Sequence, residues 1–417
     1  MKKTIVICVA ILIVGVIAAF VSVLSYLSRD EPPPDDADLR LPRLEIPDEE
    51  NAFTYFQLAC DALTYSDADE EKIDSMREGD EWDAAFVEEL LSKNNETFDF
   101  LAKGMACAEI EVPEIMGPDT ELPYLSTWRR IARLCKVRVL HLRKSDKEKE
   151  AFEEALGIVE FGRMIERCRG APIHYHVGRD IKEIGLCALR EMLADTKLDE
   201  ESLRSHVGAL AGSWADQNAF ADSFRAGYVA MARALDSIAA GKKYPGLELP
   251  DLPKWISIKP NKTKRMFAEA LRLIIEGAGK TFKEYAQEVS PRLPKYPASR
   301  ADTRVEVLLS GNTVGLMLYE ALLPVFSGIT KTKCRENVSV AATRLLIALK
   351  CYKMKTGELP GTLDALVPDY IDKIPSDDFD GEPMRYSAEK KIIYSVGEDL
   401  NDDGGGEEKD IIFEIKF

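Results

Sequence analysis

The sequence predicts a mainly α-helical body that follows a transmembrane helix and precedes a small α+β module of one helix and a three-stranded antiparallel sheet. Three observations support this fold class: an uncharged apolar run near the amino end, helical periodicity through the middle, and short strand-like segments near the carboxy end. A chain of 417 residues is long enough for more than one domain. We expect four parts, covering residues 1–28, 29–48, 49–335 and 336–417.

The composition is that of an ordinary globular protein, with 46% hydrophobic and 30% charged residues. The 55 Lys and Arg residues are outnumbered by 72 Asp and Glu residues, which gives a net charge of −17. This balance argues against nucleic acid as a partner, because phosphate binding requires basic patches. The eight cysteines form no C-x-x-C pair, and we expect mostly buried free thiols rather than zinc ligands.

The first 28 residues predict a membrane anchor. Residues 4–27 carry no charge, and as a helix rising about 1.5 Å per residue they are long enough to span a bilayer. A cleavable signal peptide is the alternative, but its apolar core would be about 7–15 residues long. Because Lys2 and Lys3 precede the run and acidic residues follow it, we expect a single-pass inner-membrane protein with its body on the periplasmic side.

The segments after the anchor predict a spacer and an all-α domain. Residues 29–48 are rich in proline and acidic residues, which indicates a stiff, extended linker. Apolar residues then recur every three or four positions, as in Trp82, Phe86 and Leu90, and such stripes are typical of helices packed in a core. We therefore expect residues 49–335 to form stacked antiparallel helix hairpins.

A second apolar run, residues 305–326, is long enough to be considered as another membrane span. It contains Glu306, Asn312 and Glu320, and polar or ionised groups are costly inside a bilayer. We therefore interpret this run as a buried core helix.

Residues 336–417 predict a helix followed by a small antiparallel sheet. Asn337 is expected to open the helix, and Gly357 follows its expected end. The segments near the end are rich in Ile, Val, Phe and Tyr, which is typical of strands. The expected elements are a helix at residues 337–356, a helical turn at 363–366, and strands at 384–386, 392–396 and 411–417.

The loop before the last predicted strand has the spacing of a calcium site. Asp399, Asn401 and Asp403 alternate, Gly404 follows, and Asp410 takes the final position of the pattern D-x-[DN]-x-[DN]-G-x5-E. Calcium takes about six to eight oxygen ligands, and a glycine permits the sharp turn that alternating ligands need. A solvated acidic loop is the alternative interpretation. The predicted ligands are Asp399, Asn401, Asp403, Gly405, Glu407 and Asp410.

The carboxy-terminal residues resemble the head domain of the type II secretion major pseudopilin, the G-type pseudopilin. The motifs that carry the resemblance are Gly357-Glu-Leu-Pro360, Leu366-Val-Pro368, Ile374-Pro375, Gly381-Glu-Pro383, Ser395-Val-Gly397 and Asp410-Ile411. The resemblance implies a pseudopilin-like module with a calcium ion held by Asp399 and Asp410 together with backbone carbonyls.

The rest of the chain departs from that family. The apolar amino-terminal run has no early Glu and no pilin-type processing site, so we do not expect the chain to polymerise as a pilus subunit. A pseudopilin-like head on a large anchored helical protein also resembles envelope proteins of planctomycete-type bacteria. This second resemblance implies partners in the cell envelope.

Two hypotheses of function follow. The first is a non-enzymatic, membrane-anchored envelope protein with a calcium-binding carboxy-terminal module, linked to protein secretion or envelope assembly. The alternative is a metal-dependent hydrolase with its site in the helical body near His174 and His176, which would need a third ligand. Residues two apart on a helix do not share a face, which favours structural roles for these histidines.

Overall fold

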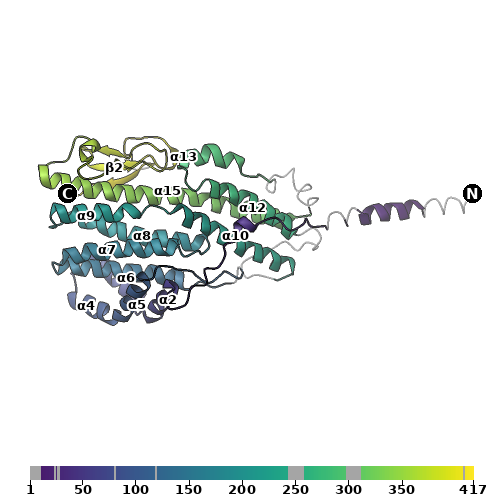
Figure 1. Cartoon of the computed structure of the whole chain (residues 1–417), viewed down its shortest axis with the longest axis horizontal. Helices are drawn as coiled ribbons and strands as arrows, with labels where there is room; N and C mark the ends of the chain where they lie inside the picture. The colour runs from purple at the N-terminus through teal and green to yellow at the C-terminus, as the bar shows by residue number, and fades with distance from the viewer. Residues whose placement is uncertain are drawn as a thin grey trace, which may run out of the picture.

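The structure is a computed structural model, and within the residues that it describes the chain is mainly helical with one three-stranded sheet (Figure 1). This confirms the coarse fold class predicted from the sequence. The described residues are 11–22, 25, 29–78, 81–117, 120–242, 258–296, 311–406 and 409–417.

The helices are α2 (Ala52–Ala62), α3 (Asp67–Glu78), α4 (Ala84–Lys93), α5 (Asn95–Met105), α6 (Tyr124–Lys144), α7 (Glu148–Glu166), α8 (Pro172–Met192), α9 (Glu200–Ala209), α10 (Gln217–Ala239), α12 (Pro260–Glu276), α13 (Phe282–Glu284) and α15 (Thr313–Thr356). The strands are β1 (Arg385–Ser387), β2 (Ile392–Ser395) and β3 (Ile411–Glu414).

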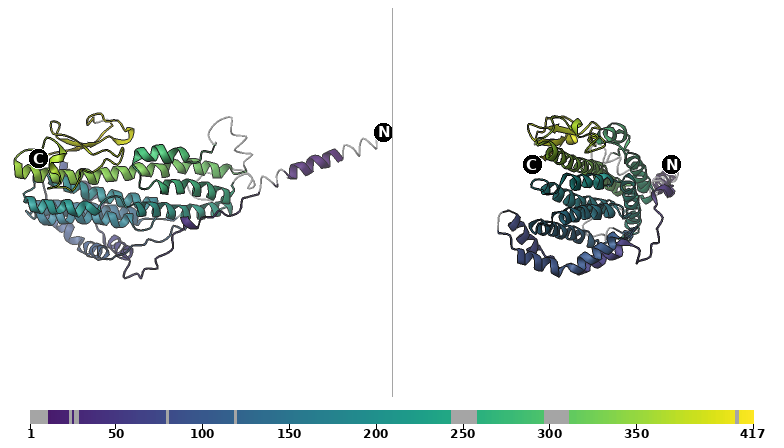
Figure 2. Two further views of the ribbon diagram at one scale, coloured as in Figure 1. Left: turned by 45° about the horizontal axis from the view of Figure 1, so that its top comes forward. Right: turned by 60° about the vertical axis from the view of Figure 1, so that its left-hand side comes forward.

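The helices of the body stack side by side, and seen nearly end-on they follow an arc from the first helices to the sheet (Figure 2). Glycines on α7 and α8 bring two neighbouring helices into close contact. A Cβ atom at Gly162 would lie 2.5 Å from the carbonyl oxygen of Gly178, so no larger residue fits there. Gly178 faces Glu166 whereas Gly185, further along α8, faces Ala155. The two helices are therefore antiparallel, as the predicted hairpins require.

Helix α15 is one continuous helix of 44 residues, so the predicted helix start at Asn337 is wrong. Asn337 does not cap its own helix: its Oδ1 accepts from the backbone N–H of Ala215 at 2.8 Å, and its Nδ2 donates to Asp378 at 3.0 Å. The predicted helix end is confirmed, because Gly357 follows α15 in the left-handed region at φ 89°. The boundary expected at residue 336 therefore falls inside α15.

The same helix bears on the membrane predictions. In the described part of the chain it is the one helix long and apolar enough to cross a bilayer, yet 39% of its most apolar stretch is buried within the protein. Leu316 and Tyr319 pack in one hydrophobic core with α10 and α12, and Leu345 and Leu349 pack in another with α7 and α8. These contacts agree with a core helix over the described part of the run 305–326.

The sheet packs on the carboxy-terminal half of α15 and continues the core of the body. Its strand order is β1-β2-β3, both pairings are antiparallel, and every residue of β2 is buried. The predicted strands and the turn Leu363–Leu366 are thus confirmed, with shifted ends. Backbone hydrogen bonds from Phe282 to Asp378 and from Lys283 to Phe379, at 2.9 and 2.8 Å, tie the module to α13.

Residues of the linker that follows the predicted anchor contact the body. The carboxylate of Asp30 accepts from the backbone N–H groups of Asn261 at 2.9 Å and Lys262 at 3.3 Å, and so caps the amino end of α12. Tyr228 donates to Asp36 at 2.8 Å, and Leu39 is 1% exposed. These contacts join segments that are far apart in the sequence.

The described part of the predicted anchor is the helix Ile11–Ser22, which is shorter than the about 20 residues that a membrane span requires. Residues 1–10, 23–24 and 26–28 lie outside the described residues. The helix extends away from the body (Figure 1), and its apolar side chains are exposed, from 52% at Ile13 to 69% at Leu12.

Candidate functional site

The candidate cation loop joins β2 to β3 and is folded by residues in the left-handed region. Leu400, Gly404 and Gly405 have φ angles of 61°, 70° and 77°. The turn predicted at Gly404 is therefore confirmed. A Cβ atom at Gly405 would lie 2.2 Å from the Cδ1 of Ile392, so the loop lies directly against β2.

Two of the predicted ligands lie on either side of one ammonium group. Lys409 Nζ is 3.3 Å from an oxygen of Asp399 and 3.9 Å from an oxygen of Asp403. Asp399 also accepts from the backbone N–H of Asn401 at 3.1 Å. This backbone hydrogen bond and the nearby Lys409 lower the pKa of Asp399. The ammonium marks a position where a cation contacts both carboxylates.

Asp410 is the buried acid of the loop, with 7% of its surface exposed. Its Oδ2 accepts from the backbone N–H groups of Gly405 at 2.8 Å and Gly406 at 3.0 Å. Its Oδ1 is shielded from water and has no hydrogen-bond partner within the described residues. A buried carboxylate oxygen without a partner is costly, and a bound cation would remove that cost.

The predicted ligands do not converge on one point. Over the described ranges, no group of three His, Cys, Asp or Glu side chains is placed to hold a metal ion. The carbonyl of Gly404 accepts from Lys390 at 2.5 Å, and Glu407 lies outside the described residues. The donor types therefore fit calcium, but the Lys409 ammonium occupies the position near Asp399 and Asp403 that the cation would take.

Asp402 has a role that the spacing did not reveal. It accepts from the hydroxyl of Tyr394 at 3.1 Å and from the backbone N–H of Gly404 at 2.9 Å, and Arg385 lies 3.7 Å away. The alternating pattern placed this residue outside the predicted ligands. The contacts indicate that it holds the loop against the sheet.

The histidine pair of the alternative hypothesis lies in and near the packed core. His174 has no exposed surface; its Nε2 is 2.9 Å from the hydroxyl of Tyr124, and its Nδ1 is 3.3 Å from the carbonyl of Ala171. Burial lowers its pKa to about 4. His176 is half-buried, and burial lowers its pKa as well. Both ring nitrogens of His174 are thus already engaged.

A second group of charges, which we call the buried charge cluster, was not predicted. It consists of Glu166 on α7, Tyr175 and Lys182 on α8, and Glu336 on α15, each at most 3% exposed. Lys182 Nζ donates to Glu166 at 2.6 Å and also contacts Glu336, which accepts from Tyr175 at 2.9 Å.

Glu166 and Lys182 of the buried charge cluster have shifted pKa values. Burial, followed by the charge of Glu336, raises the pKa of Glu166 well above its ordinary value. Burial opposes the charge of Lys182, but the two carboxylates outweigh it and raise the pKa of that ammonium. One ammonium therefore lies between two carboxylates at the point where three helices meet, and the cluster fastens α15 to the body.

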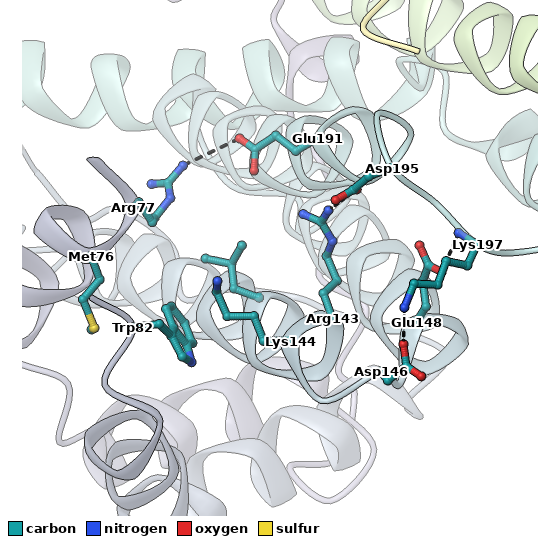
Figure 3. A pocket seen from close by; sticks show the side chains of 11 residues that line it. Met76, Arg77, Trp82, Arg143, Lys144, Asp146, Glu148, Glu191, Asp195 and Lys197 are labelled. Atoms are coloured by element: carbon teal, nitrogen blue, oxygen red, sulfur yellow. Dashed lines mark hydrogen bonds and ion pairs between the residues drawn. The ribbon is translucent and has the colours of Figure 1, made fainter. Parts of the chain in front are cut away.

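A surface pocket of about 530 Å³ lies among α3, α6, α7 and α8 (Figure 3). Most of the charges that line it are paired with one another. Arg143 contacts Asp195 at 2.5 Å, and Lys197 contacts Asp146 at 2.6 Å. Lys144 lies over the ring of Trp82, 5.0 Å from its centre. No serine, cysteine or histidine is among the described residues that line it.

The prediction of mostly buried free thiols is confirmed where the structure describes the cysteines. Seven cysteines are free thiols, and four of them are buried. Burial raises the pKa of Cys60 to about 12 and that of Cys168 to about 12, so these thiols stay protonated.

Comparisons with known protein families, curated proteins and solved structures found no match to the chain. The arguments about function therefore come from the residues themselves.

Proposed function

We propose that the chain is a membrane-anchored, non-enzymatic protein of the cell envelope whose carboxy-terminal loop binds calcium. The observation that carries the proposal is the buried, unpartnered Oδ1 of Asp410, in the same loop as two carboxylates that contact the Lys409 ammonium. The helical body would present surfaces to protein partners, and the resemblance to the pseudopilin head connects it to secretion or envelope assembly.

The proposed ligands are the six predicted from spacing: Asp399, Asn401, Asp403, Gly405, Glu407 and Asp410. The side chains of Asp399 and Asp410 are central, because one faces the Lys409 ammonium and the other has an oxygen without a partner. Calcium would replace that ammonium. Asp at the final position reaches less far than Glu, so we expect an extracellular-grade dissociation constant on the order of 0.1–1 mM.

The membrane part of the proposal rests on the exposed apolar helix Ile11–Ser22 and on the charges that flank its longer apolar run. Asp30 adds a second argument, since its hydrogen bonds to the amino end of α12 hold the start of the linker on the body. An anchor fixed in this way would orient the body relative to the membrane surface.

Calcium binding is tested by thermal unfolding of the full chain in detergent, because α15 is shared by the body and the carboxy-terminal module. At about 1 mM free calcium and a dissociation constant near 0.1 mM, binding to the folded state adds roughly 1.4 kcal/mol. Calcium should raise Tm, and magnesium should raise it much less because it demands tight octahedral geometry.

Two substitutions should abolish the calcium shift, Asp399→Ala and Asp410→Asn. Glu414→Gln is the matched control, because Glu414 is an exposed acid on β3 that contacts Lys416 rather than the loop. A wild-type protein whose Tm does not respond to several millimolar calcium would contradict the proposed site.

Membrane anchoring is tested by extraction of cell membranes with alkaline carbonate. The full chain should stay in the pellet, and a chain that lacks residues 1–28 should become soluble. If the full chain is released by carbonate, the anchor proposal fails. The calcium proposal does not depend on this result.

The alternative, a metal-dependent hydrolase at His174 and His176, has weaker support. Coordination by His174 would break its contacts to Tyr124 and Ala171 within a closed core. Elemental analysis separates the hypotheses: stoichiometric zinc in the wild type that is lost in the double variant His174→Ala, His176→Ala would favour the hydrolase.

A further inference from the structure

A pocket of about 480 Å³ lies between the body and the carboxy-terminal module, apart from the calcium loop and from the pocket in Figure 3. One wall is the middle of α15. The facing walls are the segment after α9 and the segment that precedes β1. Its lining residues include Trp214, Asn337, Arg344, Lys373, Ser376 and Asp378.

Arg344 on α15 is the unusual member of this lining. Its guanidinium lies over the ring of Trp214, 5.6 Å from the ring centre. Its Nε is shielded from water and has no hydrogen-bond partner within the described residues. Burial holds the pKa of Arg344 below its ordinary value. The neighbouring cations on the same helix differ, since Arg335 pairs with Glu398 at 3.0 Å and Lys333 pairs with Asp378 at 3.3 Å.

The contact with Trp214 involves the face of its ring and leaves the terminal N–H groups of Arg344 able to donate to a ligand. A planar acceptor with two oxygens can accept from two of these N–H groups together, in the bidentate arrangement that arginine favours. Nε stays covered by the protein, so the ligand would contact the terminal nitrogens.

The other polar groups of the pocket select the charge of the ligand. Lys373 and Ser376 are exposed on the wall that faces Arg344, where an ammonium and a hydroxyl can add hydrogen bonds. Asp378 is held by Lys333 and by Asn337, at 3.3 and 3.0 Å, and Asp372 also lines the pocket, where its charge acts on Arg344. These two acids would repel a dianionic phosphate more than a singly charged carboxylate.

We propose that this pocket binds a carboxylate, paired with Arg344 through two hydrogen bonds and supported by Lys373 and Ser376. Its volume is within the about 300–1,000 Å³ typical of small-ligand sites. The carboxylate has two sources, a free organic acid or an acidic side chain of a peptide. The proposal does not depend on calcium binding or on the anchor.

The test is isothermal titration of the full chain in detergent with five probes. Two are carboxylates: acetyl-glutamate-methylamide, and a six-residue peptide with blocked ends and one central glutamate. Two more are the glutamine forms of these probes, and the fifth is inorganic phosphate. We expect the glutamate probes to bind at least tenfold more tightly than their glutamine forms and more tightly than phosphate. The tighter of the two glutamate probes identifies the source.

Substitutions assign the binding to this pocket. Arg344→Gln should weaken binding at least tenfold, and Arg344→Lys should weaken it less, because a lysine keeps the charge but lacks the bidentate geometry. Arg335→Gln, on the same helix and paired with Glu398, should leave binding unchanged. If Arg344→Gln does not fold, Lys373→Gln and Ser376→Ala on the exposed wall should each weaken binding about threefold.

Three outcomes would overturn the proposal. One is the absence of binding of either glutamate probe to the wild type. Another is equal binding of glutamate and glutamine probes, or tighter binding of phosphate. The third is unchanged binding in a folded Arg344→Gln protein, or in the Lys373→Gln and Ser376→Ala proteins when Arg344→Gln does not fold.

Discussion

The buried charge cluster and the calcium loop use the same arrangement in opposite surroundings. In each, one ammonium lies between two carboxylates: Lys182 between Glu166 and Glu336, and Lys409 between Asp399 and Asp403. Lys182 and its two partners have at most 1% of their side-chain surface exposed, whereas the Lys409 side chain is 56% exposed. The difference lies in whether water or another cation can reach the carboxylates.

Burial decides how replaceable each ammonium is. Inside the body the charges have lost their hydration, and only their mutual contacts compensate for that loss. In the loop, water and salt can neutralise the carboxylates, and the ammonium contributes little to stability. We therefore interpret Lys182 as part of the fold and Lys409 as a cation that calcium can displace. The predictions below test this comparison, beginning with the largest expected effect.

The largest effect is expected for Lys182→Ala. The substitution leaves two buried carboxylates without their cation, and breaking a buried ion pair costs about 3–5 kcal/mol. Urea unfolding followed by circular dichroism measures the change. The control is Arg129→Ala, which breaks a pair with Asp180 whose side chains are 29% and 33% exposed and should cost about 0–1 kcal/mol. Equal losses in the two variants would remove the contrast between buried and exposed charges.

The next largest effect is the loss of stability in acid caused by His174, another buried titratable group of the body. Burial lowers its pKa to about 4 in the folded protein, whereas the unfolded chain has the ordinary value near 6.5. Between pH 6.5 and pH 4, His174 therefore binds a proton in the unfolded state but not in the folded state. The free energy of unfolding falls as the pH falls through this window. The loss is about 3 kcal/mol over that window.

The measurement is the pH dependence of the free energy of unfolding for the wild type and for His174→Gln. The variant should be less stable overall, but its stability should fall less steeply between pH 6.5 and 4. Parallel curves for the two proteins would show that folding does not lower the pKa of His174.

The buried charge cluster also shows what could not be predicted from the sequence. Apolar spacing predicts the helices because the period of a helix is local, and the hairpins of α7 and α8 follow from it. The buried charge cluster depends on Glu336 reaching α8 across 154 positions of sequence, which no local pattern contains. A notable signal was still present, since Glu166 and Lys182 occupy positions on the buried faces of their helices.

The error at Asn337 has the same origin. Asn337 has the residue type of a helix cap, but its side chain bonds Ala215 and Asp378, which lie on other elements. The contact between the linker and the body is equally non-local, because Asp30 accepts from the amino end of α12 more than two hundred positions later. For the loop, spacing located the turn at Gly404 and the buried Asp410, whereas the position of Lys409 between two carboxylates required the structure.

A smaller effect is expected when calcium is removed from the loop. A chelator should lower the Tm of the calcium-loaded wild type by the equivalent of roughly 1.4 kcal/mol at about 1 mM calcium. It should lower the Tm of calcium-loaded Lys182→Ala by the same amount. The two effects should add because the sites share no residue. A calcium decrement that disappears in Lys182→Ala would mean that the loop depends on the buried cluster.

The smallest effect on stability is expected for Lys409→Met, and the same substitution should strengthen calcium binding. The substitution removes the ammonium that lies 3.3 Å from Asp399 and 3.9 Å from Asp403, while methionine keeps the length of the side chain. Without calcium, the loop loses an exposed ion pair, so the free energy of unfolding should fall by less than about 1 kcal/mol. With calcium, the ion no longer competes with the ammonium, so its dissociation constant should fall about three- to tenfold.

Calcium titration of the wild type and Lys409→Met by isothermal calorimetry measures this change. Lys416→Met is the matched control, because Lys416 pairs with Glu414 outside the loop. The increase in affinity should shrink at high salt, since salt screens the exposed ammonium that the substitution removes. Weaker calcium binding in Lys409→Met would mean that this lysine holds the loop in its binding shape rather than occupying the position of the cation.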